Sequence, residues 1–133
     1  MRRRIQACWL LLLLGCGPKV EDSAPDYSDA EVVRDACESV CMTGFACCDL
    51  SGRPECFPMH GVTEEECVED CVGSESEWGF SAECRDAYYA NVDCASTLTC
   101  EEYVEYYKGT PGHVCEAERE ARREMVEKGC FGS

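Results

Sequence analysis

The sequence predicts a small all-α, disulfide-rich bundle of about five short helices. No stretch shows the sustained alternation of apolar and polar residues that indicates a β-strand. Helix-start signals recur along the chain instead, each followed by apolar residues or cysteines at helical spacing. Twelve of the 14 cysteines lie beyond residue 16, and such an even number is typical of a disulfide framework.

Capping boxes mark the starts of three helices. In each, a hydroxyl residue precedes a glutamate by three positions, so that the two side chains satisfy each other's free backbone N–H groups. The three boxes are Ser28–Glu31, Thr63–Glu66 and Thr99–Glu102. The helix that follows Thr99 is expected to end near Lys108-Gly109, because glycine favours the left-handed conformation at a helix end.

Two further helices complete the bundle. One is expected to begin at Ser81 and to carry Cys84, Tyr88 and Cys94 on one side. The last is expected to begin at Thr110-Pro111, since proline suits the first helical position. Its inner stripe would be Val114, Ala117, Ala121 and Met125, with Glu118–Arg122 and Glu124–Lys128 pairs on its outer face.

The front of the chain has the parts of a secretory signal. Three arginines at residues 2–4 precede a short apolar run from Ala7 to Leu14, and small Gly15 follows. The run is too short to cross a bilayer, which takes about 20 residues. Residues 1–15 are therefore predicted to be a signal peptide.

Leu13-Leu14-Gly15-Cys16 resembles the lipobox of bacterial lipoproteins. The resemblance implies that the Cys16 thiol receives a diacylglyceryl group, that cleavage falls between Gly15 and Cys16, and that the new amine is acylated. Two or three acyl chains, at about 0.8 kcal/mol per buried methylene, would anchor the protein stably. The alternative is an ordinary signal cut near Gly15 or Gly17. Gly17 is not the aspartate that retains some lipoproteins at the inner membrane, which favours the outer membrane of a bacterial envelope.

Composition limits the class of partner. Removing the first 15 of 133 residues leaves 118, with 9 basic against 27 acidic residues and a net charge of −18. This charge argues against nucleic acid or anionic headgroups as partners and leaves basic proteins or cations. Residues 16–27 are expected to form a lipidated, flexible acidic tether, and residues 28–133 one disulfide-stapled helical domain.

Disulfides are expected to replace a conventional core. Leu, Val and Phe supply only 17 of the 118 residues and Ile none, a composition that would otherwise predict disorder. Each bridge typically contributes about 2–4 kcal/mol by restricting the unfolded chain. The cysteines expected to form them are Cys37, Cys41, Cys47, Cys48, Cys56, Cys67, Cys71, Cys84, Cys94, Cys100, Cys115 and Cys130.

Two C-x3-C pairs predict a laced helical hairpin. Cysteines four apart share one helix face, so two antiparallel helices can be joined by Cys37–Cys71 and Cys41–Cys67. The other pairings stay open. Cys48 with Cys56 would close a loop, and Cys94 with Cys100 would span a turn. Adjacent Cys47 and Cys48 are expected to reach different partners.

This cysteine pattern resembles two known groups. The twin C-x3-C hairpin is similar to that of small chaperones of the mitochondrial intermembrane space, and we interpret it as the same structural solution without the chaperone function. The whole pattern, with CRDAYYANVDCASTLTCEE at residues 84–102, resembles uncharacterised cysteine-rich lipoproteins of myxobacteria and their relatives. That resemblance implies no known activity.

No catalytic constellation is evident. A thiol-redox enzyme would need a C-x-x-C or an activated lone thiol, and the spacing of the cysteines and two histidines fits no zinc site. His60 and His113 are expected to be solvated turn residues, and the acids of residues 64–70 are expected to form a solvated helix face. The tyrosines are expected to pack over the disulfides. The prediction is a non-catalytic structural or partner-binding lipoprotein, with no cofactor or metal and an unknown protein or saccharide ligand. The alternatives are an envelope thiol-redox protein and a cation-binding protein.

Overall fold

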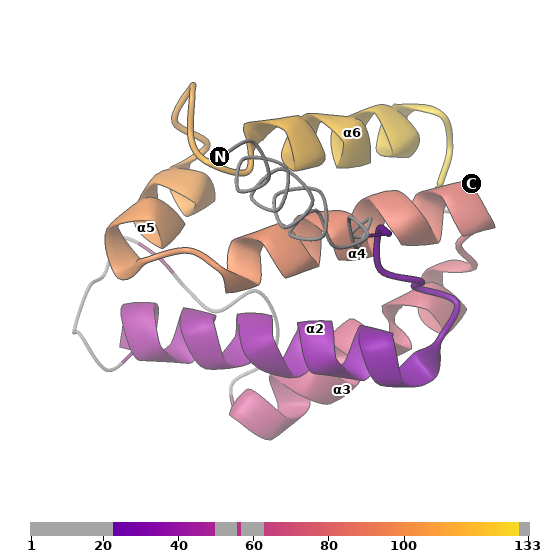
Figure 1. Ribbon diagram of the computed structural model, residues 1–133, viewed down its shortest axis with the longest axis horizontal. Coiled ribbons are helices and arrows are strands. Elements are labelled where there is room, and N and C mark those ends of the chain that lie inside the picture. The colour runs from indigo at the N-terminus through magenta and orange to yellow at the C-terminus, as the bar shows by residue number, and fades with distance from the viewer. Residues whose placement is uncertain (1–22, 50–55, 57–62, 131–133) are drawn as a thin grey trace, which may run out of the picture.

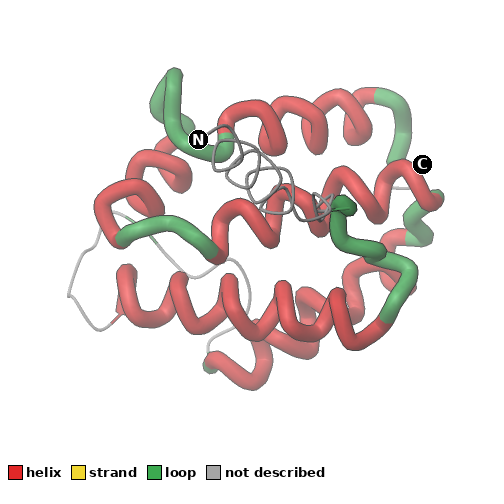
Figure 2. Tube along the Cα trace, viewed as in Figure 1, coloured by secondary structure: helices red, strands yellow, loops and turns green. Residues whose placement is uncertain are grey.

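A computed structural model describes residues 23–49, 56 and 63–130 of the protein. Within these ranges the chain forms helices and connecting loops without strands, as the sequence predicts (Figure 2). The elements are α2 (Ala30–Gly44), the short π-helix η1 (Phe45–Asp49), α3 (Glu64–Trp78), α4 (Ala82–Ser96), α5 (Cys100–Lys108) and α6 (Glu116–Glu127). The predicted all-α class is confirmed.

Helix α4 is the centre of the bundle. It packs against α2 on one side and against α6 on the other, so that the three helices form successive layers (Figure 1). Helix α3 packs on α2, and α5 packs on η1. The chain therefore folds as the α2–α3 hairpin and the α4–α6 pair, with α2 against α4 joining the two halves.

The helix ends largely follow the predicted capping signals. Both halves of the capping box form at Thr63 and at Thr99, and the Ser81 hydroxyl caps α4. Gly109 ends α5 at φ 70°, where a side chain would be strained. The N-cap of α2 is Asp29, whose side chain accepts the Glu31 backbone N–H, so the prediction of Ser28 was wrong by one residue. The Ser28 hydroxyl instead donates to Asp26 Oδ1 over 2.6 Å, and this hydrogen bond lowers the pKa of Asp26.

The last helix differs from its prediction in both start and inner face. Residues 110–115 form turns, and α6 begins only at Glu116, after Cys115. Val114 is 61% exposed, and Ala117 and Ala121 of the expected apolar stripe also face solvent. The half-buried side of the helix carries Glu118, Arg119, Arg122 and Met125, so Met125 is the one residue of the expected stripe that lies on it. The two alanines of the expected stripe offer too little apolar surface to turn their side of the helix toward the bundle.

Sulfur and tyrosine fill the core in place of leucine. Tyr89 and Tyr103 are completely buried, together with cysteines from α2, α3 and the loop before α6. Tyr27 is also buried, and its hydroxyl donates to Asp93 on α4 over 3.2 Å. The predicted tether of residues 16–27 is therefore too long at its end, because Tyr27 belongs to the packed domain.

Candidate functional site

The lipidation and cleavage residues predicted from sequence, Cys16 and Gly15, lie outside the described residues, as does His60. The structure places the other predicted site residues, which are the cysteines, in one connected framework. All twelve cysteines from Cys37 to Cys130 form disulfides, six in number.

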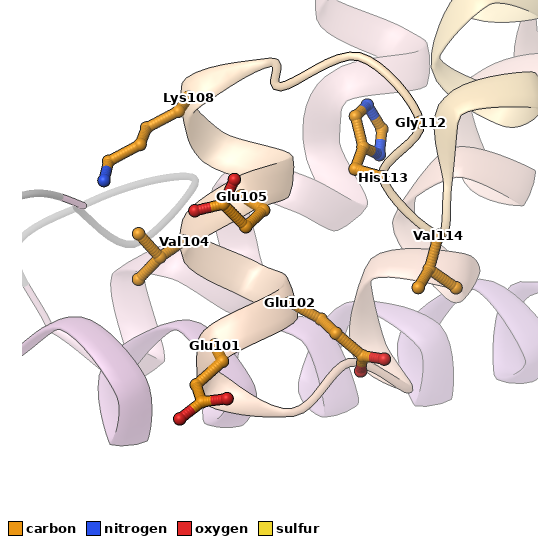
Figure 3. Close-up of a pocket in the computed structure, with 8 residues that line it drawn as sticks. All are labelled: Glu101, Glu102, Val104, Glu105, Lys108, Gly112, His113 and Val114. Carbon is orange, nitrogen blue, oxygen red and sulfur yellow. The ribbon is translucent and has the colours of Figure 1, made fainter.

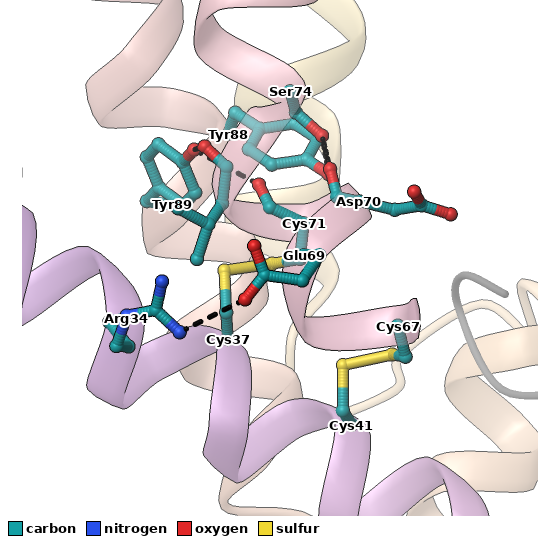
Figure 4. The surroundings of a disulfide bond; sticks show 11 residues. Arg34, Cys37, Cys41, Cys67, Glu69, Asp70, Cys71, Ser74, Tyr88 and Tyr89 are labelled. Atoms are coloured by element: carbon teal, nitrogen blue, oxygen red, sulfur yellow. Dashed lines mark hydrogen bonds and ion pairs between the residues drawn. A yellow bond between two sulfur atoms is a disulfide. The ribbon is translucent and has the colours of Figure 1, made fainter. Parts of the chain in front are cut away.

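The α2–α3 hairpin is laced as its spacing predicts. Cys37 bonds to Cys71 and Cys41 to Cys67, with all four side chains completely buried (Figure 4). The hydroxyl of Tyr89 on α4 donates to the Cys71 carbonyl over 3.1 Å. Arg34 and Glu69 form an exposed ion pair at 3.3 Å between the same two helices (Figure 4). The hairpin is thus closed by two bridges and fastened to α4 by tyrosine.

The remaining bridges join elements that are distant in sequence. Cys48–Cys56 closes its loop as expected, and Cys47 reaches a different partner, Cys100 at the start of α5. The expected Cys94–Cys100 bridge is wrong. Cys94 bonds to Cys115 before α6, because α4 packs on α6 while α5 packs on η1, so the two cysteines face different neighbours.

The sixth bridge fastens the end of the described chain. Cys84, in the first turn of α4, bonds to Cys130, which follows α6. Cys94 and Cys115 hold the opposite ends of the same two helices. Helix α6 is thus held antiparallel along α4 by a bridge at each end.

The buried tyrosines form two contact groups, Tyr27 with Tyr88 and Tyr89, and Tyr103 with Tyr106, which together are called the tyrosine cluster; arginines of α6 lie over one ring of each group. The rings of Tyr88 and Tyr89 meet edge-on at 5.0 Å, and that of Tyr103 lies 6.0 Å from that of Tyr106. The Arg122 guanidinium lies over the Tyr88 ring at 5.2 Å, and that of Arg119 over the Tyr106 ring at 5.3 Å. These cation–π contacts were not predicted, since Arg122 was expected to pair with Glu118 on the outer face. The sequence signal that could have indicated these contacts is the three-residue spacing of Arg119 and Arg122, which sets both side chains on one face of α6.

Burial changes the titration of this cluster. It raises the pKa of Tyr27 to about 12, with the nearby Asp93 carboxylate adding to the effect. Burial likewise raises the pKa of Tyr89 to about 12 and that of Tyr103 further. In the unfolded chain these phenols ionise near 10, so the folded state retains protons that the unfolded state has lost.

Stability is therefore expected to fall as the pH rises from about 10 to about 12. Below pH 10 both states hold the phenolic protons, and the contribution of burial is fully present. Guanidinium unfolding with intact disulfides, at neutral pH and at stepwise higher pH, measures this loss. Tyr27→Phe removes one titrating phenol and should flatten the decline. A free energy of unfolding that is constant across this interval contradicts the prediction.

An acidic cleft of about 540 Å³ lies between α5 and the loop before α6 (Figure 3). His113 and Val114 line its loop side, and three glutamates and one lysine line its α5 side: Glu101, Glu102, Glu105 and Lys108. Glu102 is engaged in its capping box at Thr99, whereas the carboxylates of Glu101 and Glu105 are exposed. The cleft offers anionic oxygens beside an exposed apolar side chain.

His113 is less solvated than predicted. Its ring packs edge-on against Tyr106 at 5.5 Å, and its Nδ1 is buried without a hydrogen-bond partner. The ring is half-buried because the turns of residues 110–115 fold back over α5. Its Nδ1 therefore makes no hydrogen bond to a described nucleophile or acid.

A second acidic cleft, of about 600 Å³, runs along the α2–α3 hairpin. Its lining includes Glu38, Glu64, Glu65 and Glu69, with Met42 exposed by 58% at one side. The acids of residues 64–69 are exposed, as expected for a solvated helix face. Both clefts thus combine carboxylates with one exposed apolar residue.

In the described part of the chain, no three His, Cys, Asp or Glu side chains converge as metal ligands would. None of the described helices has the length and apolar character needed to span a bilayer. No protein-family model, no curated protein and no solved structure matches the chain. The site is therefore interpreted from its own chemistry, which is a disulfide framework with acidic clefts.

Proposed function

We propose that this protein is a lipid-anchored lipoprotein of the bacterial cell envelope, whose acidic domain binds a basic protein partner without catalysing a reaction. The observation that carries the proposal is the closure of all twelve cysteines from Cys37 to Cys130 in disulfides, behind a lipobox at Cys16. Such a framework persists in oxidising, extracytoplasmic compartments. Cys16, the one cysteine of the mature chain outside it, is the residue that would carry lipid. The outer membrane is the favoured location.

Mass spectrometry of the full-length protein produced in a bacterial host tests the anchor. We expect the mature chain to begin at Cys16 with two or three acyl chains, and to partition with the membrane fraction. Cys16→Ala should abolish lipidation and membrane retention, because alanine lacks the thiol that accepts the lipid. Cys8→Ala, in the predicted signal, is the matched control and should be processed normally. A mature chain that begins elsewhere, or an unmodified Cys16, contradicts the proposal.

Charge supports the choice of a basic partner. A net charge of −18 on the mature chain attracts cations of any size, and the α5 cleft is lined by the exposed residues Glu101, Glu105 and Val114. A lysine- or arginine-bearing segment with an apolar side chain matches this combination.

Titration with a synthetic amphipathic Lys/Leu peptide tests the cleft. We expect Glu101→Gln/Glu105→Gln to weaken binding by roughly 2- to 30-fold, since an exposed ion pair contributes about 0.2–1 kcal/mol. Glu31→Gln/Glu77→Gln, which removes the same charge from exposed positions outside the clefts described, is the control. Equal affinities of the two double variants would show that the cleft has no special role.

A further inference from the structure

Helix α6 has an unusual attachment to the rest of the domain. It contains no buried residue, and eight of its twelve residues are charged. Such a helix gains little from apolar burial, so it depends on the groups that fasten it. Between its end bridges these are the Arg122 and Arg119 stacks on tyrosine and a hydrogen bond from Arg119 to the Tyr106 carbonyl.

The bridge at the end of α6 differs from the others in its surroundings. Cys130 is half-buried and Cys84 is 7% exposed, whereas the four cysteines of the hairpin are fully buried. Cys94 and Cys100 are half-buried as well, so the feature that sets this bridge apart is the cleft beside it. A cleft of about 230 Å³ opens on this bridge, and Lys128 and Glu83 also line it. No cysteine lines the two acidic clefts, or a third cleft of about 440 Å³ that Arg119 and Val126 of α6 line. An attacking thiolate therefore has a path to this disulfide.

Cys84 is placed to leave as a thiolate. The Ser81 hydroxyl donates a hydrogen bond to Cys84 Sγ over 3.0 Å, while it accepts the Cys84 backbone N–H. Cys84 is the third residue of α4, where the free N–H groups of the helix stabilise negative charge. A lower thiol pKa in the leaving group speeds thiol–disulfide exchange.

We propose that Cys84–Cys130 is a reducible latch, opened by a protein or small-molecule dithiol, that releases α6 from the tyrosine cluster. One thiolate of the dithiol attacks Cys130 Sγ; a mixed disulfide forms, the Cys84–Cys130 bond breaks, and Cys84 leaves as a thiolate. The second thiol then attacks the mixed disulfide, which frees Cys130 and oxidises the dithiol to a disulfide. Two electrons pass to the protein, and each new thiolate takes up a proton.

Opening the latch leaves α6 fastened at one end, through Cys94–Cys115. Its distal half is then held by the Arg122 stack and by half-buried Met125, which are individually weak contacts. Displacement of Arg122 uncovers the Tyr88 ring, which is 3% exposed in the closed form. The consequence is a tyrosine surface that is hidden or available according to the redox state of one bridge.

Timed reduction of the folded protein tests the latch. The mature chain is treated with a low concentration of dithiothreitol, and free thiols are blocked with N-ethylmaleimide at timed intervals. The blocked cysteines are then identified by mass spectrometry. We expect Cys84–Cys130 to open at least about 10-fold faster than Cys94–Cys115 and the hairpin bridges. Hydrogen exchange should then rise over residues 116–127 while the α2–α3 hairpin keeps its protection. Simultaneous opening of all bridges, or unchanged exchange in α6 after Cys84–Cys130 has opened, overturns the proposal.

Variants of Ser81 separate the leaving-group effect from simple exposure. Ser81→Asp keeps a good helix cap but cannot donate to sulfur, so we expect opening to slow by about 10-fold, the effect of one lost hydrogen bond to a charged group. Ser81→Thr retains both functions and should restore the rate. Cys94–Cys115 is the internal reference in each variant. Equal rates for Asp and Thr overturn the role of Ser81. These outcomes involve neither Cys16 nor a basic partner, so they are independent of the proposed function.

Discussion

Complete reduction of the six disulfides is expected to unfold the domain. Each bridge contributes about 2–4 kcal/mol, so six together contribute about 12–24 kcal/mol, which equals or exceeds most of the range of about 5–15 kcal/mol by which domains are typically stable. The remaining core, with Leu98 its one leucine among the described residues, cannot offset this loss. We expect the helical circular dichroism of the reduced, alkylated protein to fall to that of an unfolded chain.

The control for this experiment is protein treated with the alkylating agent alone, which should keep its full helical signal. Stepwise reduction should show that the Cys37–Cys71 and Cys41–Cys67 bridges open with the cooperative loss of structure, because their sulfurs are buried. A reduced protein that retains a cooperative thermal transition near that of the oxidised form would refute the view that sulfur replaces the apolar core.

Tyr89→Ala is expected to destabilise the oxidised domain by about 3–5 kcal/mol, as for other large-to-small substitutions of buried aromatic residues. Tyr89 is completely buried; its ring packs on Tyr88 at 5.0 Å and on Tyr27 at 6.0 Å. Its hydroxyl donates to the Cys71 carbonyl, so it also fastens α4 to the hairpin. Guanidinium unfolding with intact bridges measures the change in free energy of unfolding.

Tyr89→Phe is the matched control, since it keeps the ring and removes only the hydroxyl. We expect it to cost about 1 kcal/mol, the net contribution of one hydrogen bond. Equal losses in the two variants would mean that the hydroxyl, and not the ring, holds α4 to the hairpin. A loss below 1 kcal/mol in Tyr89→Ala would contradict the packing role of the tyrosine cluster.

The features that the sequence predicted correctly are those that depend on residues close together in the chain. The caps at Thr63, Ser81 and Thr99 and the end of α5 at Gly109 follow from hydrogen bonds within a few residues. The hairpin bridges were predictable for a similar reason, because four-residue spacing sets two sulfurs on one face and one antiparallel partner satisfies both. The burial of Tyr88, Tyr89 and Tyr103 followed from the shortage of leucine.

Predictions failed where distant segments compete. Proximity in sequence favoured Cys94–Cys100, but the packing of α4 on α6 gives Cys94 a different neighbour. The half-buried side of α6 is largely charged, so its arginines, and not its alanines, meet the bundle. Tyr27 was assigned to the tether because nothing next to it in the chain indicates its partner Asp93, 66 residues away.

The amino-acid sequence alone determined that this protein is helical, cross-linked by disulfides and strongly acidic. Helix caps and cysteine spacing act through residues that are close in the chain, and the net charge is a sum over all residues. Only the tertiary structure decided which distant cysteines meet, that α6 is held at its ends over tyrosine, and that Cys84–Cys130 opens on a cleft. The physical reason is that these features depend on how helices face one another, and a polar helix such as α6 carries no apolar stripe that would indicate its orientation.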